Sequence, residues 1–361
     1  MAKHFQSLRI KDIIQETPDC ISVSFEIPDA LKEEFVHRAG QNITLRTTIN
    51  GEEIRRSYSI CSSPFENDFR IAIKKADQGR FSTYAHKSFQ VGRWMEVMAP
   101  TGNFYLRHHD KNKKHYIAFA AGSGITPVIS ILKNILTSEP ESRMTLIYGN
   151  RKKTDIIFHE ELEAIKNSNA EKFQLINIFS KEKMDAPISE GRIDTEKCAA
   201  IFKNLIPIHQ DQIFLLCGPA PMIFNVRNWL LKHRINEKNI HYELFSDPND
   251  KDIYRKEKIP EQIVESEKKS IVAIRLDGIT KNFSVPFSGP SILDAAIIEG
   301  ADLPYACRAG VCASCRAKLV TGKVTMDQNY SLADEELEQG FILACQSHPA
   351  SETLFIDFDI R

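Results

Sequence analysis

The first hundred residues consist of short runs rich in β-branched, aromatic and aliphatic residues, separated by polar turns. These runs predict strands at 8–14, 21–27, 43–49, 54–60, 69–74 and 94–98. Asn50-Gly51 lies between two of them, and both residues readily adopt the positive φ that a two-residue hairpin turn requires. Many short strands joined by turns predict a β-barrel over residues 1–107.

The pattern changes after Tyr105, where strand-like and helical segments alternate. Apolar runs predict strands at 116–120, 144–148, 173–179 and 213–217, and helical periodicity is found at 127–136, 160–166 and 221–233. Pro221 suits the first turn of a helix, where its missing N–H is not needed. Alternating strands and helices predict a parallel sheet with helices on its faces over residues 108–245.

Residues 246–269 break this alternation, because they are charged, contain two prolines and offer few apolar side chains. Their composition predicts a linker, with a solvated helix as the alternative. A third unit follows at 270–361. It opens on a hairpin pattern around Asp277-Gly278 and then shows a capping signature at Ser291 and Asp294, which predicts a helix to Glu299.

The same capping signature recurs at Ser331 and Asp334, and 354–358 alternates as a strand. The third unit is therefore predicted to be α+β. Three domains and a linker agree with the length of 361 residues, since domains average about 150 residues.

Charge narrows the classes of function. The chain has 47 Lys and Arg against 48 Asp and Glu, a formal net charge of −1, which argues against a dedicated nucleic-acid-binding protein. The balance is uneven, because residues 270–361 carry 7 basic and 12 acidic residues and so a net −5, which leaves +4 elsewhere. An acidic module beside a mildly basic one favours docking of one on the other or on a partner.

Apolar segments bear on location. The sequence has no apolar run of about 18 residues, so no membrane-spanning helix is predicted. The first ten residues lack the apolar core of a signal peptide. We therefore expect a cytoplasmic, reducing environment, where clustered cysteines act as metal ligands or redox groups.

Four of the eight cysteines lie within the last 55 residues: Cys307, Cys312, Cys315 and Cys345. The first three form a C-x4-C-x2-C run, the plant-type spacing for a [2Fe–2S] cluster. Zinc is the main alternative, but zinc ribbons usually use two C-x2-C pairs and only one is present. The Ala- and Gly-rich residues between the thiols allow backbone N–H groups to approach sulfur. The spacing therefore favours a [2Fe–2S] cluster over zinc or a disulfide.

Several short motifs are individually weak indications of nucleotide binding. They are Arg56-Ser57-Tyr58-Ser59, Gly79-Arg80-Phe81-Ser82, Gly122-Ser123-Gly124-Ile125-Thr126-Pro127, Cys217-Gly218-Pro219-Ala220-Pro221-Met222 and Glu243-Leu244-Phe245. The glycine-rich turn between a strand and a helix permits close approach of a pyrophosphate. Each motif alone also fits an ordinary strand, turn or buried thiol.

Taken in this order, the motifs resemble those of the ferredoxin–NADP reductase superfamily over residues 1–245, and residues 270–361 resemble a plant-type ferredoxin. The resemblance implies a Greek-key FAD-binding barrel, an α/β NADP-binding domain and a β-grasp ferredoxin. It places FAD at Arg56, Ser57, Tyr58, Ser59, Ile73, Lys74, Phe81 and Ser82. It places the pyridine nucleotide at Gly122, Ser123, Gly124, Thr126, Pro127, Cys217, Gly218, Pro219 and Met222.

The resemblance also implies catalytic roles and a choice of nucleotide. Tyr58, Ser59, Cys217, Glu243 and Phe245 would surround the flavin and the nicotinamide. A 2′-phosphate would lie at Ser180, Lys181 and Arg192, and these basic side chains favour NADPH over NADH. Lys181 stands where the family often has arginine, which keeps the charge but loses the bidentate fork.

The domain order, with a reductase first and a ferredoxin last, is similar to that of the reductase components of bacterial multicomponent oxygenases. The overall resemblance is greatest to the reductases of phenylacetyl-CoA epoxidases, which implies a terminal oxygenase partner, a di-iron complex. Reductases of ketosteroid or ring-hydroxylating oxygenases remain alternatives. So does a non-catalytic electron-transfer subunit of a dehydrogenase complex, although the intact nucleotide motifs argue against it.

Overall fold

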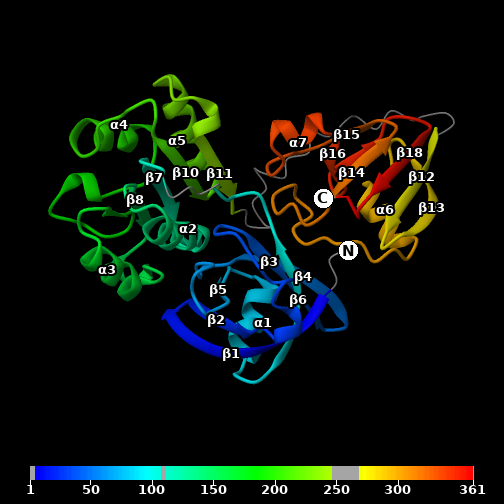
Figure 1. Ribbon diagram of the computed structural model, residues 1–361, viewed down its shortest axis with the longest axis horizontal. Coiled ribbons are helices and arrows are strands. Elements are labelled where there is room, and N and C mark those ends of the chain that lie inside the picture. The colour runs from blue at the N-terminus through cyan, green and yellow to red at the C-terminus, as the bar shows by residue number, and fades with distance from the viewer. Residues whose placement is uncertain (1–4, 107–110, 246–267, 361) are drawn as a thin grey trace.

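The computed structural model describes residues 5–106, 111–245 and 268–360. Three lobes follow one another along the chain, each with its own apolar core (Figure 1). The linker predicted at 246–269 lies almost wholly outside the described residues, and the strand that opens the third lobe begins at Lys269.

The first lobe is a curled antiparallel sheet in the strand order β4-β3-β6-β1-β2-β5. Its elements are β1 (Phe5–Thr17), β2 (Cys20–Glu26), β3 (Asn42–Ile49), β4 (Glu52–Ser59), β5 (Arg70–Lys74), α1 (Arg80–Ser88) and β6 (Trp94–Thr101). A bridge between Ile60 and Ile71 joins the two edges, so the sheet closes as the predicted barrel. Asn50 and Gly51 have φ values of 54° and 81°, which confirms the predicted hairpin turn.

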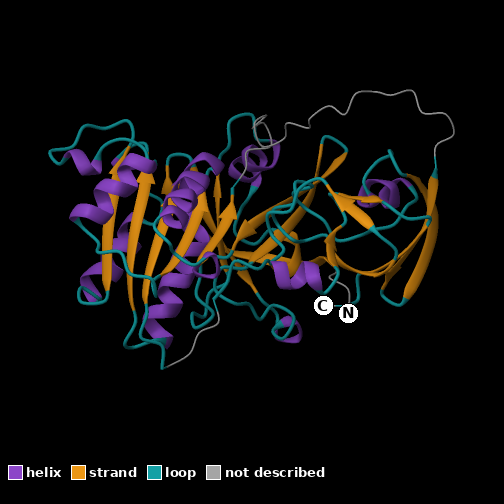
Figure 2. Cartoon of the chain, turned by 90° about the horizontal axis from the view of Figure 1, so that it is seen from above, coloured by secondary structure: helices purple, strands orange, loops and turns teal. Residues whose placement is uncertain are grey.

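The second lobe is a parallel sheet in the order β11-β10-β7-β8-β9, with an apolar cluster on each face. Helices cover both faces of this sheet (Figure 2). Its elements are β7 (His115–Ala121), α2 (Ile125–Ser138), β8 (Arg143–Asn150), α3 (His159–Ser168), β9 (Phe173–Phe179), α4 (Thr195–Asn204), β10 (Ile213–Gly218), α5 (Ala220–Lys232) and β11 (Ile240–Leu244). The strand order reverses between β7 and β10, and ligands bind at such a point in open α/β sheets.

The third lobe (residues 268–360), which we call the ferredoxin module after the resemblance given above, is built on a mixed sheet in the order β13-β12-β18-β14-β16. Its elements are β12 (Lys269–Leu276), β13 (Ile279–Pro286), α6 (Ile292–Ile298), β14 (Arg316–Thr321), β15 (Val324–Met326), α7 (Asp334–Glu338), β16 (Phe341–Leu343), β17 (Ser347–Pro349) and β18 (Thr353–Asp357). β15 and β17 form a separate two-stranded sheet. The hairpin and helix of this lobe match the α+β prediction.

The two capping predictions in this lobe have different outcomes. Ser291 Oγ accepts a hydrogen bond from the Asp294 N–H, which confirms the first cap. The second prediction is wrong, because the N-cap of α7 is Ala333, whose N–H donates to Glu336 Oε2. Ser331 Oγ instead donates to the Gly310 carbonyl, so tertiary contact overrides the local signature.

Two helices lay outside the predicted elements. α1 begins at Arg80, inside the Gly79–Ser82 motif that was predicted as a turn, so only Gly79 of that motif precedes the helix. α4 begins after Asp194, whose side chain accepts a hydrogen bond from the Lys197 N–H. Short 3-10 turns lie at Asp29–Leu31, Gly122–Gly124, Lys153–Asp155, Pro187–Ser189 and Glu237–Asn239. No helix within 5–106, 111–245 and 268–360 is long and apolar enough to span a membrane.

Candidate functional site

The strand β4 presents its residues alternately to two sides, as a β-strand must. The ring of Tyr58 packs near that of Phe81, with centroids 5.7 Å apart. Burial raises the pKa of Tyr58, so its hydroxyl stays neutral. Ser57 and Ser59 lie on the other face, where Ser57 Oγ is 3.1 Å from Thr44 Oγ1. The predicted flavin strand is therefore aromatic on one face and carries hydroxyls on the other.

The turn before α1 forms the second part of the predicted flavin site. Ser82 Oγ accepts a hydrogen bond from the Ala76 N–H and donates to the Gly79 carbonyl, so this hydroxyl holds the turn together. Arg80 opens the helix and pairs with Glu52 at 2.8 Å. The first N–H groups of a helix have no partners within it and favour an anion, so the turn suits a diphosphate.

β5 leads into this turn and contributes Ile73 and Lys74. Ile73 is fully buried, and its carbonyl lies 2.9 Å from His86 Nε2 of α1. Lys74 is partly exposed, and its Nζ is 3.5 Å from Asp19 Oδ2. A lysine beside the predicted diphosphate turn fits an anionic ligand.

The glycine turn after β7 meets the end of β10 at the sheet's switch point. A Cβ placed on Gly124 would lie 2.2 Å from the Cys217 carbonyl oxygen, so only glycine fits there. Gly122 has φ 52°, and its carbonyl accepts a hydrogen bond from the Tyr148 hydroxyl. Thr126 Oγ1 closes the turn by donating to the Ser123 carbonyl. The structure thus brings the two predicted nucleotide motifs together.

β11 places Glu243 beside Cys217, its partner in the strand register. Glu243 Oε2 accepts a hydrogen bond from Ser59 Oγ of the barrel at 3.3 Å. Burial raises the pKa of Glu243 to about 8, although the Ser59 hydrogen bond lowers it. Burial, and the nearby Glu243 carboxyl, hold the pKa of Cys217 well above its usual value. Both groups are therefore neutral at pH 7.

Phe245 and the turn after β10 complete this part of the site. The Phe245 N–H donates to the Gly218 carbonyl, which fixes the chain just beyond β11. Pro219 is the N-cap of α5, and the Met222 side chain folds over Gly218, at 2.9 Å from where its Cβ would stand. The five predicted catalytic residues thus come from β4, β10, β11 and the residue that follows β11.

The residues predicted at a 2′-phosphate lie at the carboxyl end of β9. The Lys181 N–H donates to the Arg151 carbonyl, and the Gly191 N–H donates to the Phe179 carbonyl. This second bond returns the segment that carries Arg192 to the strand end, next to Ser180. All three predicted side chains, Ser180, Lys181 and Arg192, are exposed.

The four clustered cysteines fall into two pairs. A hydrogen bond between Cys307 and Cys312 raises the pKa of the first and lowers that of the second. Cys315 and Cys345 share a similar bond, with the pKa of Cys315 raised. Among the described residues, no three potential ligand side chains converge to hold one metal ion. Two thiol pairs instead fit a two-iron cluster, with one pair for each iron.

The loop around these thiols also fits a cluster. Arg308, Gly310 and Ala313 have positive φ values of 53°, 73° and 53°. This backbone directs the N–H groups of Ala309 and Cys312 toward Cys307 Sγ, at 3.3 and 3.4 Å. N–H groups aimed at sulfur stabilise thiolate ligands. Gln346 Nε2, which no sequence motif indicated, approaches Cys345 Sγ at 3.7 Å.

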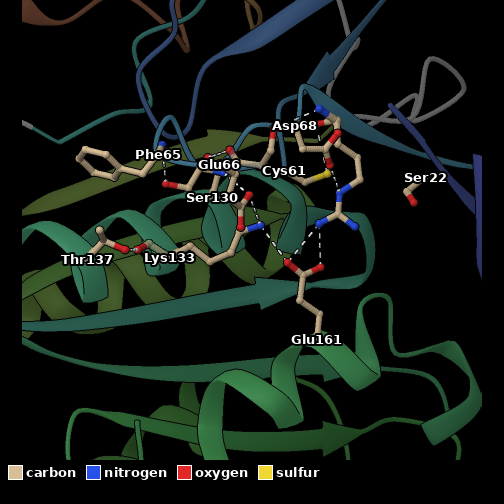
Figure 3. Close-up of polar contacts among 12 residues, drawn as sticks. Ser22, Cys61, Phe65, Glu66, Asp68, Ser130, Lys133, Thr137 and Glu161 are labelled. Carbon is tan, nitrogen blue, oxygen red and sulfur yellow. Dashed lines mark hydrogen bonds and ion pairs between the residues drawn. The ribbon is translucent and has the colours of Figure 1, made fainter. Parts of the chain in front are cut away.

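A partly buried ionic network joins the barrel to the second lobe (Figure 3). Lys133 Nζ of α2 lies 2.8 Å from both Glu66 Oε2 and Glu161 Oε1. Arg70 of β5 donates two hydrogen bonds to Glu161, at 2.9 and 3.1 Å. Ser130 Oγ adds a bond to the Ser62 carbonyl. No sequence motif marked these residues, because their spacing along the chain is that of unrelated surface charges.

Comparisons with known proteins agree with this architecture. Residues 7–105 match the oxidoreductase FAD-binding domain, 119–228 the oxidoreductase NAD-binding domain and 274–350 the 2Fe-2S iron-sulfur cluster binding domain. The solved structure of phthalate dioxygenase reductase matches with a TM-score of 0.58 at 24% identity, covering 98% of both chains. A type IV self-sufficient cytochrome P450 monooxygenase matches with a TM-score of 0.70 at 19% identity, over 98% of this chain and 41% of that one.

Two curated relatives extend over nearly the whole chain. A component of the 1,2-phenylacetyl-CoA epoxidase from Escherichia coli is 38% identical, covering 99% of this chain and 98% of its own. The ferredoxin reductase component of 3-ketosteroid-9-alpha-monooxygenase from Rhodococcus rhodochrous is 30% identical, covering 97% and 96%.

Fold and site together define an NAD(P)H-dependent oxidoreductase of the ferredoxin reductase type, with FAD, pyridine-nucleotide and [2Fe–2S] domains. Within that class, the chain belongs to the family of oxygenase reductase components that includes these two relatives.

Proposed function

We propose that this chain takes electrons from NADPH and delivers them, through FAD and the [2Fe–2S] cluster, to a terminal oxygenase. The observation that carries the proposal is that the predicted flavin strand contacts both the nucleotide domain and the cluster loop. Ser59 of the predicted flavin strand bonds Glu243 of the nucleotide domain, and Ser314 of the cluster loop lies 3.3 Å from Thr44 beside the same strand.

Each cofactor has residues that would hold it. Tyr58 would contact the flavin ring, Ser59 would bond its nitrogen edge, and the turn before α1 would take the diphosphate. FAD, when bound, supplies the conversion of a two-electron donor into single electrons. Phe245 would stack on the flavin ring, Cys217 would help to set the pose of the nicotinamide, and Glu243 would present a neutral carboxyl near the ring.

The preference for NADPH follows from the exposed basic side chains at the end of β9. Lys181→Ala should lower kcat/KM for NADPH by roughly tenfold and leave that for NADH almost unchanged, because a charge-assisted contact to phosphate is lost. Lys183→Ala, two residues further along, is the matched control. A wild-type enzyme that prefers NADH would contradict this assignment.

The partner that the relatives favour is a phenylacetyl-CoA epoxidase, since a subunit of such an enzyme is 38% identical, and we propose that this partner is a di-iron oxygenase. The test mixes this reductase and NADPH with a purified oxygenase of that class and measures epoxidation of phenylacetyl-CoA. A ketosteroid monooxygenase oxygenase serves as the rival partner, because its reductase is 30% identical. Turnover with the rival alone would overturn the partner assignment.

A further inference from the structure

Arg55, which directly precedes the predicted flavin motif on β4, reaches across to the ferredoxin module. Its Nη1 donates to the Leu303 carbonyl at 3.0 Å and its Nη2 to Asp302 Oδ1 at 2.7 Å. Its guanidinium carbon also lies 4.3 Å from the centre of the Tyr305 ring. All three partners precede Cys307, so one side chain contacts the segment that leads into the cluster loop.

All three nitrogen atoms of the Arg55 guanidinium group donate hydrogen bonds, although the group lies between two lobes. Its side chain is only 4% exposed, and its Nε donates to Glu53 Oε1 at 2.8 Å. Phe5 covers it further, 5.0 Å from the ring centre. Burying an arginine is costly unless its donors are paired, so the contacts of Arg55 with the module are needed for this conformation.

Other contacts hold the same two surfaces together. Thr44 of β3 lies 3.3 Å from Ser314, between two of the cluster cysteines, and pairs with Ser57 across the hairpin. Asn103 Nδ2 donates to the Ser331 carbonyl and to Glu336 Oε2. Arg46 of the barrel also lies near this segment, with its Nη1 3.8 Å from Asp302 Oδ2, but its side chain is 18% exposed against 4% for Arg55.

We propose that Arg55 is a positioning residue for electron transfer within the chain, which docks the ferredoxin module with its cluster loop against the flavin strand. The proposal rests on the proposed function and adds to it the residue that sets the geometry between the two redox centres. Small displacements of one redox centre relative to the other slow electron transfer strongly, as a misplacement of about 1 Å slows a catalysed reaction.

The test follows the holoenzyme by anaerobic rapid mixing with NADPH. Flavin bleaching reports the first transfer, and the cluster's visible and paramagnetic signals report the second. Arg55→Gln should leave flavin bleaching within about twofold of wild type and slow cluster reduction by roughly tenfold or more. Ferricyanide reduction, which draws on the flavin, should persist, whereas cytochrome c reduction through the cluster should fall.

A second variant guards against loss of folding in the barrel. Asp302 is 73% exposed, so Asp302→Arg should fold, yet it places a like charge beside Arg55 and Arg46. It should produce the same selective slowing. Arg9→Gln is the matched control, because Arg9 is 52% exposed on the barrel, where it pairs with the exposed Glu26.

The outcomes separate the two proposals. Unchanged cluster reduction in both Arg55→Gln and Asp302→Arg would overturn the role of Arg55. Wild-type protein whose flavin is not bleached by NADPH would instead overturn the proposed function. An equal loss of both phases in Arg55→Gln, with normal behaviour in Asp302→Arg, would also refute the positioning role.

Discussion

Ser59 Oγ of the barrel donates a hydrogen bond to Glu243 Oε2 of the parallel sheet, at 3.3 Å. The two residues are 184 positions apart, and this bond joins the predicted flavin strand to the predicted nicotinamide site. Because Glu243 is buried, its pKa is raised to about 8 and it accepts the bond as a neutral carboxyl at pH 7. Glu243 therefore adds no negative charge to the site at pH 7.

Glu243 predicts a pH dependence of flavin reduction. Below about pH 8 the carboxyl is protonated, and above it the group ionises and places a negative charge where electrons arrive. The rate of flavin bleaching by NADPH should therefore fall as pH rises through 8. Glu243→Gln, which stays neutral, should match wild type at pH 7 and lose this step. A variant that keeps the same pH profile would assign the step to another group.

Gly124 predicts a steric requirement at the switch point. Gly124→Ala should weaken NADPH binding and destabilise the second lobe by about 1–3 kcal/mol, because the added Cβ meets backbone atoms that cannot move aside. Titration of NADPH into the oxidised protein measures the binding. Gly51→Ala is the control, since nothing lies within 4 Å of its Cβ and only backbone strain at its φ of +81° is added. Similar NADPH affinity in both variants would argue against the site.

The paired thiols predict which cysteines are needed for the cluster. Cys315→Ser should abolish bound iron and sulfide. In the proposed arrangement each iron is held by two thiolates, and this substitution leaves one iron with a single thiolate. FAD binding and flavin bleaching should survive, since the barrel and the parallel sheet have their own cores. Iron analysis and the visible spectrum give the measurement. Cys198→Ser is the comparison, because Cys198 is buried on α4, and iron loss in that variant would contradict the assignment.

Lys133 predicts the strength of the contact between the first two lobes. Its side chain is 10% exposed, and its two carboxylate partners are 36% and 26% exposed, so Lys133→Met should destabilise the pair of lobes by about 1–3 kcal/mol, between the costs of breaking an exposed and a buried ion pair. Denaturant midpoints followed by flavin release report the loss. Lys166→Met removes a 44% exposed lysine that pairs with Glu163 and should cost less than about 1 kcal/mol. Equal destabilisation by Lys133→Met and Lys166→Met would show that the network around Lys133 adds nothing to the stability of the two lobes.

Much of the fold could be predicted because its signals are local. The strand from Phe173 to Phe179 is bounded as its apolar run predicts, and the Asn50-Gly51 turn needs only two residues to specify it. α4 was missed because its cap at Asp194 stands before a short segment with only three buried residues. The cap predicted at Ser331 was wrong because its hydroxyl donates a hydrogen bond to the Gly310 carbonyl instead of capping the helix.

The sequence by itself determined the chemistry that this chain carries. Cysteine spacing, the glycine turn of 122–124 and the order of the short motifs are properties of neighbouring residues, so they survive as patterns along the chain. Only the tertiary structure decided which of these parts meet. Arg55 and Asp302 are 247 residues apart, and their contact depends on how the β3–β4 hairpin and the cluster loop are placed in space. Such hydrogen bonds and buried charge pairs form between residues that folding brings close together. No local pattern in the sequence marks two residues so far apart as partners.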